Sequence, residues 1–198
     1  MINNVLLKLV YLYYPKNICP WNEKDKYIQT IEYKRLQSTI DYFDSDVNLI
    51  IRKKIKKYFE DDEILKNFQD FSRLDYNQDR CYTFFLNVVE GGEMYSISLH
   101  LSVLIPYYVI RKGWHTHSPL FPKSKIEEIE REKLDTRKME ELILDIETIV
   151  EEKLLYKKFP SSLMNNLIID TSFGDIYLGN FTMFNAFFNN SNINENKN

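Results

Sequence analysis

The sequence predicts an α+β domain with a central antiparallel hairpin and helices packed mainly on one face of the sheet. Three observations indicate this fold class: two strand-like runs joined by Gly91-Gly92, helical stripes before them, and a long helical stripe after them. Strands that cluster in the middle of a chain, without regular βαβ alternation, are typical of α+β folds. We expect one domain over residues 1–190 and a disordered polar tail over residues 191–198.

The segment before the hairpin is expected to hold a strand followed by helices. Val5 to Tyr14 is apolar and rich in Val, Leu and Tyr, which favours a strand, with a short helix as the alternative. Apolar residues at helical spacing predict helices over Asn22 to Phe43 and over Val47 to Phe59. A further short helix is expected over Ile64 to Leu74.

The hairpin is the clearest element of the sequence. Cys81 to Val89 is rich in aromatic and β-branched residues and predicts a strand. Glu90 to Glu93 predicts a turn, because paired glycines permit the positive φ angles that hairpins need. In the strand that follows, from Tyr95 to Ile105, apolar residues alternate with polar ones, which is typical of an antiparallel sheet with one apolar face. The polar positions are Ser96, Ser98, His100 and Ser102.

The second half of the chain is expected to be mainly helical. Tyr107 to Arg111 continues the sheet or forms its edge. A charged helix opens at Ser124 with the form of a capping box, and a long helix starts near Asp135 and runs to about Lys158. Phe181 to Phe188 is apolar and aromatic, and is compatible with either a strand or a helix.

Composition indicates the cellular setting. The chain has two cysteines, Cys19 and Cys81, which is no disulfide framework, so a reducing cytoplasm is the simplest location. The apolar stretch near the N-terminus lacks the flanking pattern of a signal peptide, and no apolar run reaches the ~18–20 residues of a membrane span. The net charge of −3 argues against general binding of nucleic acid. We therefore expect a cytoplasmic protein that binds neither nucleic acid nor membrane.

Residue patterns with catalytic potential are few. His115 and His117 are two residues apart and can reach one metal ion together, but no third ligand follows at a recognised spacing. His100 is able to act as a general base near neutral pH, yet no nucleophile motif surrounds its neighbouring serines. Neither a phosphate-binding loop nor a dinucleotide fingerprint occurs. We therefore predict no catalytic residues, no cofactor and no metal, and keep a metal-dependent enzyme using His115 and His117 as an alternative.

Charge is segregated along the chain. Residues 126–152 contain 11 acidic and four basic residues, whereas Arg52 to Lys57 is a basic run. An acidic surface attracts a basic partner over long range and raises its association rate. Tyr and Trp side chains often anchor such interfaces. The residues expected to contact a protein partner are Glu140, Glu141, Asp145, Tyr107, Tyr108 and Trp114.

Two stretches resemble known proteins. The first runs from Tyr13-Tyr14-Pro15 to Ile18 and, after Tyr27, continues as Thr30-Ile31-Glu32-Tyr33-Lys34-Arg35-Leu36; the second is Gly174 to Phe184. A first strand that ends in a Tyr-Pro turn, followed by a helix with a Glu-x-x-Arg-Leu stretch, resembles bacterial immunity proteins of polymorphic toxin systems. The resemblance implies a small cytoplasmic protein that binds a cognate toxin domain and blocks it without a cofactor. It assigns no binding residues, because the matched positions are hydrophobic and turn residues.

The absence of a catalytic motif, the separated charges and the resemblance together favour a non-enzymatic immunity protein. A chaperone or adaptor for a secreted effector is the alternative, and it would use the same aromatic and acidic surfaces. The metal-dependent enzyme described above is the second alternative.

Overall fold

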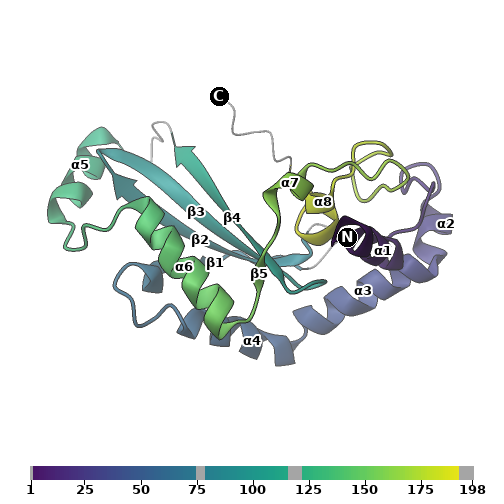
Figure 1. Cartoon of the computed structure of the whole chain (residues 1–198), viewed down its shortest axis with the longest axis horizontal. Helices are drawn as coiled ribbons and strands as arrows, with labels where there is room; N and C mark the ends of the chain where they lie inside the picture. The colour runs from purple at the N-terminus through teal and green to yellow at the C-terminus, as the bar shows by residue number, and fades with distance from the viewer. Residues whose placement is uncertain (1, 75–78, 116–121, 192–198) are drawn as a thin grey trace.

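The structure is a computed structural model that describes residues 2–74, 79–115 and 122–191 (Figure 1). The expected disordered tail lies, apart from Ser191, outside the described residues. The helices are α1 (Ile2–Tyr13), α2 (Lys24–Gln29), α3 (Ile31–Asp44), α4 (Asp46–Lys57), α5 (Lys123–Glu132), α6 (Met139–Lys153), α7 (Ser161–Met164) and α8 (Met183–Phe187), with a 3-10 turn η1 (Leu65–Asn67). The strands are β1 (Gln69–Asp70), β2 (Cys81–Glu90), β3 (Glu93–Ser102), β4 (Tyr107–His115) and β5 (Lys157–Lys158).

The sheet confirms the predicted α+β class. Its strand order is β1-β2-β3-β4-β5, and only β5 runs parallel to its neighbour. The predicted hairpin is β2 and β3, in register from Cys81 opposite Ser102 to Glu90 opposite Glu93. Gly91 and Gly92 both have positive φ, at 62° and 74°, which matches the right-handed twist of the two strands.

The apolar face of the sheet packs on α6 and on the junction of α3 and α4. Tyr82, Leu101 and Tyr108 are register partners on adjacent strands, so their side chains point to this one face. The Tyr108 hydroxyl donates to Glu151 of α6 at 2.7 Å, and the Tyr82 hydroxyl donates to the Phe43 carbonyl at 3.1 Å. Figure 1 shows α6 crossing this face of the sheet.

The polar face is also covered along most of β3. Ser96, His100 and Ser102 are buried, although their alternation with apolar residues is the pattern of a solvated face. The Phe184 ring of α8 meets the His100 ring at 6.3 Å between centroids. At the hairpin end, Ile126 of α5 packs against the last residues of β2 and the first of β3. Helices therefore lie over both ends of this face.

The N-terminal segment is a helix, so the preferred expectation of a strand over Val5 to Tyr14 was wrong. Leu6, Val10 and Tyr14 are buried at a spacing of four residues, which is the period of a helix face. The Tyr14 hydroxyl donates to the Ala186 carbonyl at 2.7 Å. Contact with the C-terminal end of the chain thus overrides the β propensity of the Val- and Tyr-rich stretch.

Other element boundaries also differ from those expected. The predicted helix over Asn22 to Phe43 is split at Thr30, whose hydroxyl accepts from the Tyr33 backbone N–H and caps α3. The segment from Ile64 to Leu74 is η1 followed by β1 and not a helix. The aromatic segment from Phe181 to Phe188 contains α8, which settles its two alternatives in favour of a helix.

The main core contains buried residues of α1, α2, α3, α4, α6, α8 and the sheet, and the buried Arg80 lies against its Phe173 ring. Its guanidinium is fully buried, donates from Nη2 to the Asn185 carbonyl, and lies 4.7 Å from the centre of the Phe173 ring. Its backbone N–H donates to the Phe188 carbonyl at 2.6 Å, and its carbonyl accepts from Val103 at 2.9 Å. We call residues 173–188 the C-terminal aromatic segment. The hydrogen bonds of Arg80 therefore join the C-terminal aromatic segment to the start of β2.

We expect Arg80→Ala to lower the free energy of unfolding by about 3 kcal/mol, because the change opens a cavity and leaves the Asn185 carbonyl without its donor. Arg73→Ala is the control, since Arg73 is exposed, and it should change stability by less than about 0.5 kcal/mol. Urea unfolding followed by circular dichroism measures both. Equal effects of the two substitutions would contradict the role assigned to Arg80.

Candidate functional site

The expected acidic contact residues lie on the first two turns of α6, and each has a partner within the molecule. Glu140 pairs with Lys112 of β4. Glu141 accepts from the Lys138 backbone N–H at 2.9 Å and caps its own helix, and Asp145 pairs with Arg137 at 2.7 Å. Part of the acidic charge of α6 therefore stabilises the fold.

The expected aromatic anchors separate into buried and exposed rings. Tyr108 is fully buried under α6, so the expectation that it offers a surface ring was wrong. Tyr107 is half-buried with its ring 5.8 Å from that of Phe159. Trp114 is 53% exposed, and its indole N–H donates to Glu93 at 3.1 Å. Among the three, only Trp114 offers a largely exposed ring to a partner.

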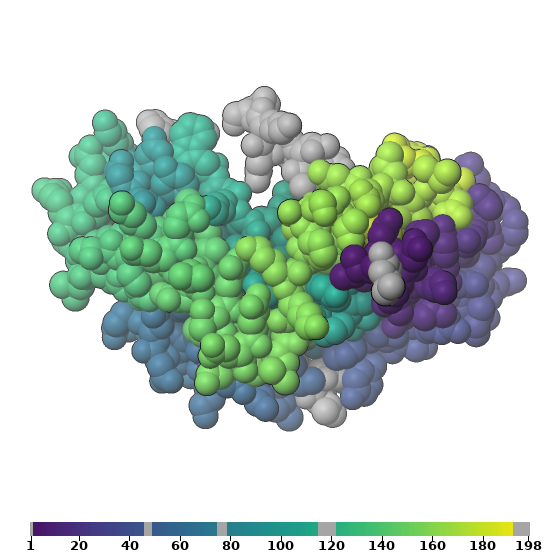
Figure 2. All heavy atoms as spheres, in the orientation of Figure 1, coloured from purple at the N-terminus to yellow at the C-terminus, as the bar shows by residue number. Residues whose placement is uncertain are grey.

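A groove of about 800 Å³ lies where the acidic stretch turns from α5 to α6. The segment that follows α4 forms one wall, and the α5–α6 connection forms the other. In Figure 2 the green α5–α6 segment borders the blue segment that follows α4. We call this the acidic groove. Its lining residues are Glu63, Ile64, Ile129, Glu132, Lys133, Leu134, Asp135 and Thr136.

The α5–α6 wall of the groove is held on the end of the hairpin. The Glu130 carboxylate accepts hydrogen bonds from the backbone N–H groups of Gly91 and Gly92. Lys133 donates to the Val89 carbonyl at 3.2 Å, and the Met139 backbone N–H donates to Glu90 at 3.1 Å. The predicted turn thus also positions the acidic stretch, because Gly91 and Gly92 bind Glu130, which lies 39 and 38 residues later in the chain.

Arg137 joins the two walls of the groove. Its guanidinium pairs with Asp62 at 2.8 Å, with Asp135 beside it, and with Asp145 at 2.7 Å. The hydrogen bond from Arg137 lowers the pKa of Asp62 to about 2 and also lowers the pKa of Asp135. Three carboxylates share this one guanidinium, which leaves a net negative charge beside the groove.

The groove has both apolar and acidic lining residues. Leu134 is 100% exposed, and Ile64 and Ile129 are half-buried. The Glu132 side chain is exposed and makes no hydrogen bond or ion pair within the described part of the chain. The volume is within the range of ligand sites, about 300–1,000 Å³. These features suit an amphipathic segment that carries Lys or Arg beside apolar side chains.

The sequence indicated the charge of this region but not the groove. Ile64 and Leu134 are far apart in the chain, and each stands among charged residues without a periodic pattern. The one available signal was Leu134 itself, an apolar residue in a charged stretch outside the helical stripes.

The structure brings Cys81 and His100 together across β2 and β3. The Cys81 sulfur lies 3.8 Å from His100 Nδ1, Thr83 Oγ1 lies 3.2 Å from the same nitrogen, and Ser98 Oγ lies 3.1 Å from Nε2. Burial raises the pKa of the Cys81 thiol to about 12 and lowers the pKa of His100 to about 3. A nucleophilic cysteine needs the opposite shifts, toward thiolate and imidazolium. The geometry of a thiol–imidazole pair is present without the electrostatics that would activate it.

The proposed metal pair falls partly outside the described residues. His117 lies outside them, and His115 is the last residue of β4, opposite Met94. Within residues 2–74, 79–115 and 122–191, no three His, Cys, Asp or Glu side chains are grouped as metal ligands.

Cys19 and Cys81 are both free thiols. In the same ranges no helix has the length and apolar character needed to cross a membrane.

His100 should make stability depend on pH. Its pKa is about 3 in the fold against an ordinary value of 6.5, so only the unfolded chain takes up its proton as the pH falls below 6.5. Stability from this group is therefore complete above pH 6.5 and is lost toward pH 3. Between pH 7 and pH 4.5, the free energy of unfolding of His100→Gln should fall by about 2 kcal/mol less than that of the unaltered chain. Urea unfolding at the two pH values measures both proteins. If His100→Gln and the unaltered chain lost the same free energy of unfolding, the result would contradict a buried neutral imidazole.

Comparison with known proteins gives no relative from which to transfer a function. No protein-family model, no curated protein and no solved structure matches the chain. The resemblance to immunity proteins therefore stays a prediction, and the surface chemistry of the chain itself must indicate what it binds.

Proposed function

We propose that the chain is a non-enzymatic immunity protein that neutralises a bacterial toxin by binding a basic surface of the toxin domain in the acidic groove. The observation that carries this proposal is that the fully exposed Leu134 lines the groove together with Ile64, Ile129 and the acidic residues Glu63, Glu132 and Asp135. Exposed apolar surface rimmed by charge is typical of protein-interaction sites. Opposite charge at the rim accelerates encounter with a basic partner.

The chemistry of the partner follows from the charge of the groove. Enzymes that act on nucleic acids bind phosphate groups through clefts of Lys and Arg. An acidic groove offers such a cleft a competing anionic surface, and Leu134, Ile64 and Ile129 can cover the aliphatic parts of its side chains. A cytoplasmic site of action is in keeping with two free, buried thiols.

The direct test of this function is coexpression with the products of the genes that flank the gene for this chain, screened for a toxic domain. The proposal expects restored growth of the host and a stable complex of the two proteins on size exclusion. Restored secretion of an effector without inhibition of its activity would instead identify a chaperone or adaptor. A chain that neither binds nor protects would contradict the proposal.

Charge reversal in the groove should slow binding to that toxin domain. Glu132→Lys introduces a positive charge at an exposed rim position, so we expect the association rate at low salt to fall about tenfold. The difference should shrink in about 0.5 M salt, because exposed charges are screened there. Surface plasmon resonance at several ionic strengths measures both effects.

Asp41→Lys is the matched control, since Asp41 is an exposed carboxylate on α3, away from the groove, and the change in net charge is identical. Its association rate should change less than about twofold. Equal slowing by both substitutions would show that net charge, and not the groove, governs the encounter.

A further inference from the structure

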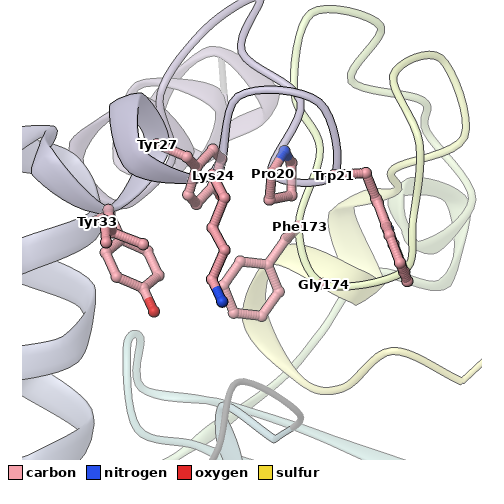
Figure 3. A pocket seen from close by; sticks show the side chains of 8 residues that line it. Pro20, Trp21, Lys24, Tyr27, Tyr33, Phe173 and Gly174 are labelled. Carbon is pink, nitrogen blue, oxygen red and sulfur yellow. The ribbon is translucent and has the colours of Figure 1, made fainter.

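A second cavity lies at α2, at the end of the molecule opposite the acidic groove (Figure 1). It has a volume of about 150 Å³. Aromatic rings form most of its wall, and one lysine enters it (Figure 3). We call it the aromatic cavity. Its lining residues are Pro20, Trp21, Lys24, Tyr27, Ile28, Tyr33, Phe173 and Gly174.

The rim of the aromatic cavity exposes large rings to solvent. Trp21 is 62% exposed and Tyr177 is 55% exposed, and the two rings stack with centroids 6.4 Å apart. Ile28 and Leu178 are also exposed beside them. Trp and Tyr are enriched among the residues that dominate binding energy at protein interfaces. The rim is therefore suited to cover a partner side chain that enters the cavity.

The base of the cavity is held rigidly by buried hydrogen bonds. The Tyr27 hydroxyl donates to the Ser172 carbonyl at 2.9 Å, and the Ser172 hydroxyl donates to the Ile18 carbonyl at 2.8 Å. These bonds join α2 and the loop before it to Ser172, the residue immediately before the C-terminal aromatic segment. Because both walls are fixed before binding, a ligand need not order them.

Lys24 gives the cavity a chemical preference. Figure 3 shows its side chain extending along the cavity, with Nζ on the same side as the Tyr33 hydroxyl. The Lys24 ammonium has no ion pair or hydrogen bond with the described residues. Lys24 is exposed in the free chain, so its attraction for a carboxylate becomes stronger only where an aromatic ligand group covers it and excludes water. The complementary ligand is therefore anionic next to an apolar or aromatic group.

We propose that the aromatic cavity binds an aromatic side chain flanked by a carboxylate, within an acidic segment of a protein partner. The cavity holds about one large side chain and is smaller than the usual sites for whole small molecules, about 300–1,000 Å³. This site does not depend on the acidic groove, because it lies at the other end of the molecule and selects the opposite charge.

The test uses the acetylated, amidated peptide Gly-Glu-Phe-Glu-Gly and its counterpart with Gln in place of both Glu residues. Binding is followed through the two indole N–H signals in nitrogen-15 NMR spectra, with Trp114 as the internal control. We expect the Trp21 signal to shift saturably with a Kd on the order of 1–10 mM and the Gln peptide to bind at least fivefold more weakly. Lys24→Met should remove this preference, and Lys8→Met, at an exposed position on α1, should keep it.

Three outcomes would overturn the proposal. The first is equal binding of the two peptides to the unaltered chain. The second is equal shifts of the Trp21 and Trp114 signals. The third is binding of free phenylacetate without binding of the Glu peptide, which would identify a site for a small aromatic acid and not for a protein segment.

Discussion

The fold depends on the contact between Arg80 and the C-terminal aromatic segment. Arg80 stands immediately before the hairpin, and its backbone and guanidinium bind Phe188 and Asn185 near the other end of the chain. The segment in turn packs on α1 through Tyr14 and on the polar face of the sheet through Phe184. The hydrogen bond from Nη2 to the Asn185 carbonyl and the contact with the Phe173 ring offset part of the cost of burying this charge.

The sequence predicted the secondary-structure elements that are specified by residues close together in the chain. The hairpin could be recognised because Gly91-Gly92 and the alternation in β3 are both short-range signals. The helical state of α1 could not, because Leu6, Val10 and Tyr14 become a buried face only when α3 and the C-terminal aromatic segment pack on them. Long-range packing also buries Ser96, His100 and Ser102 of β3. Their alternation with apolar residues, taken alone, predicts a solvent-exposed face.

The candidate site was predictable in its charge but not in its shape. Composition indicates an acidic region, yet only the structure shows that Glu140 pairs with Lys112 and that Asp145 pairs with Arg137. In the structure, the candidate site is the connection between α5 and α6 and not α6 itself, because Glu132 at the start of this connection lines the groove. The burial of Tyr108 has the same kind of cause, since α6 reaches it from about 40 residues away.

Hydrogen exchange tests most directly whether a basic partner surface binds in the acidic groove. Backbone amide exchange is compared between the free chain and its complex with the toxin partner identified by coexpression. We expect slower exchange in the complex at residues 62–66 and 130–137, which include lining residues of both walls and the Asp62–Arg137 pair between them. Unchanged exchange in both walls, with slowing confined to other surfaces, would contradict binding in the groove.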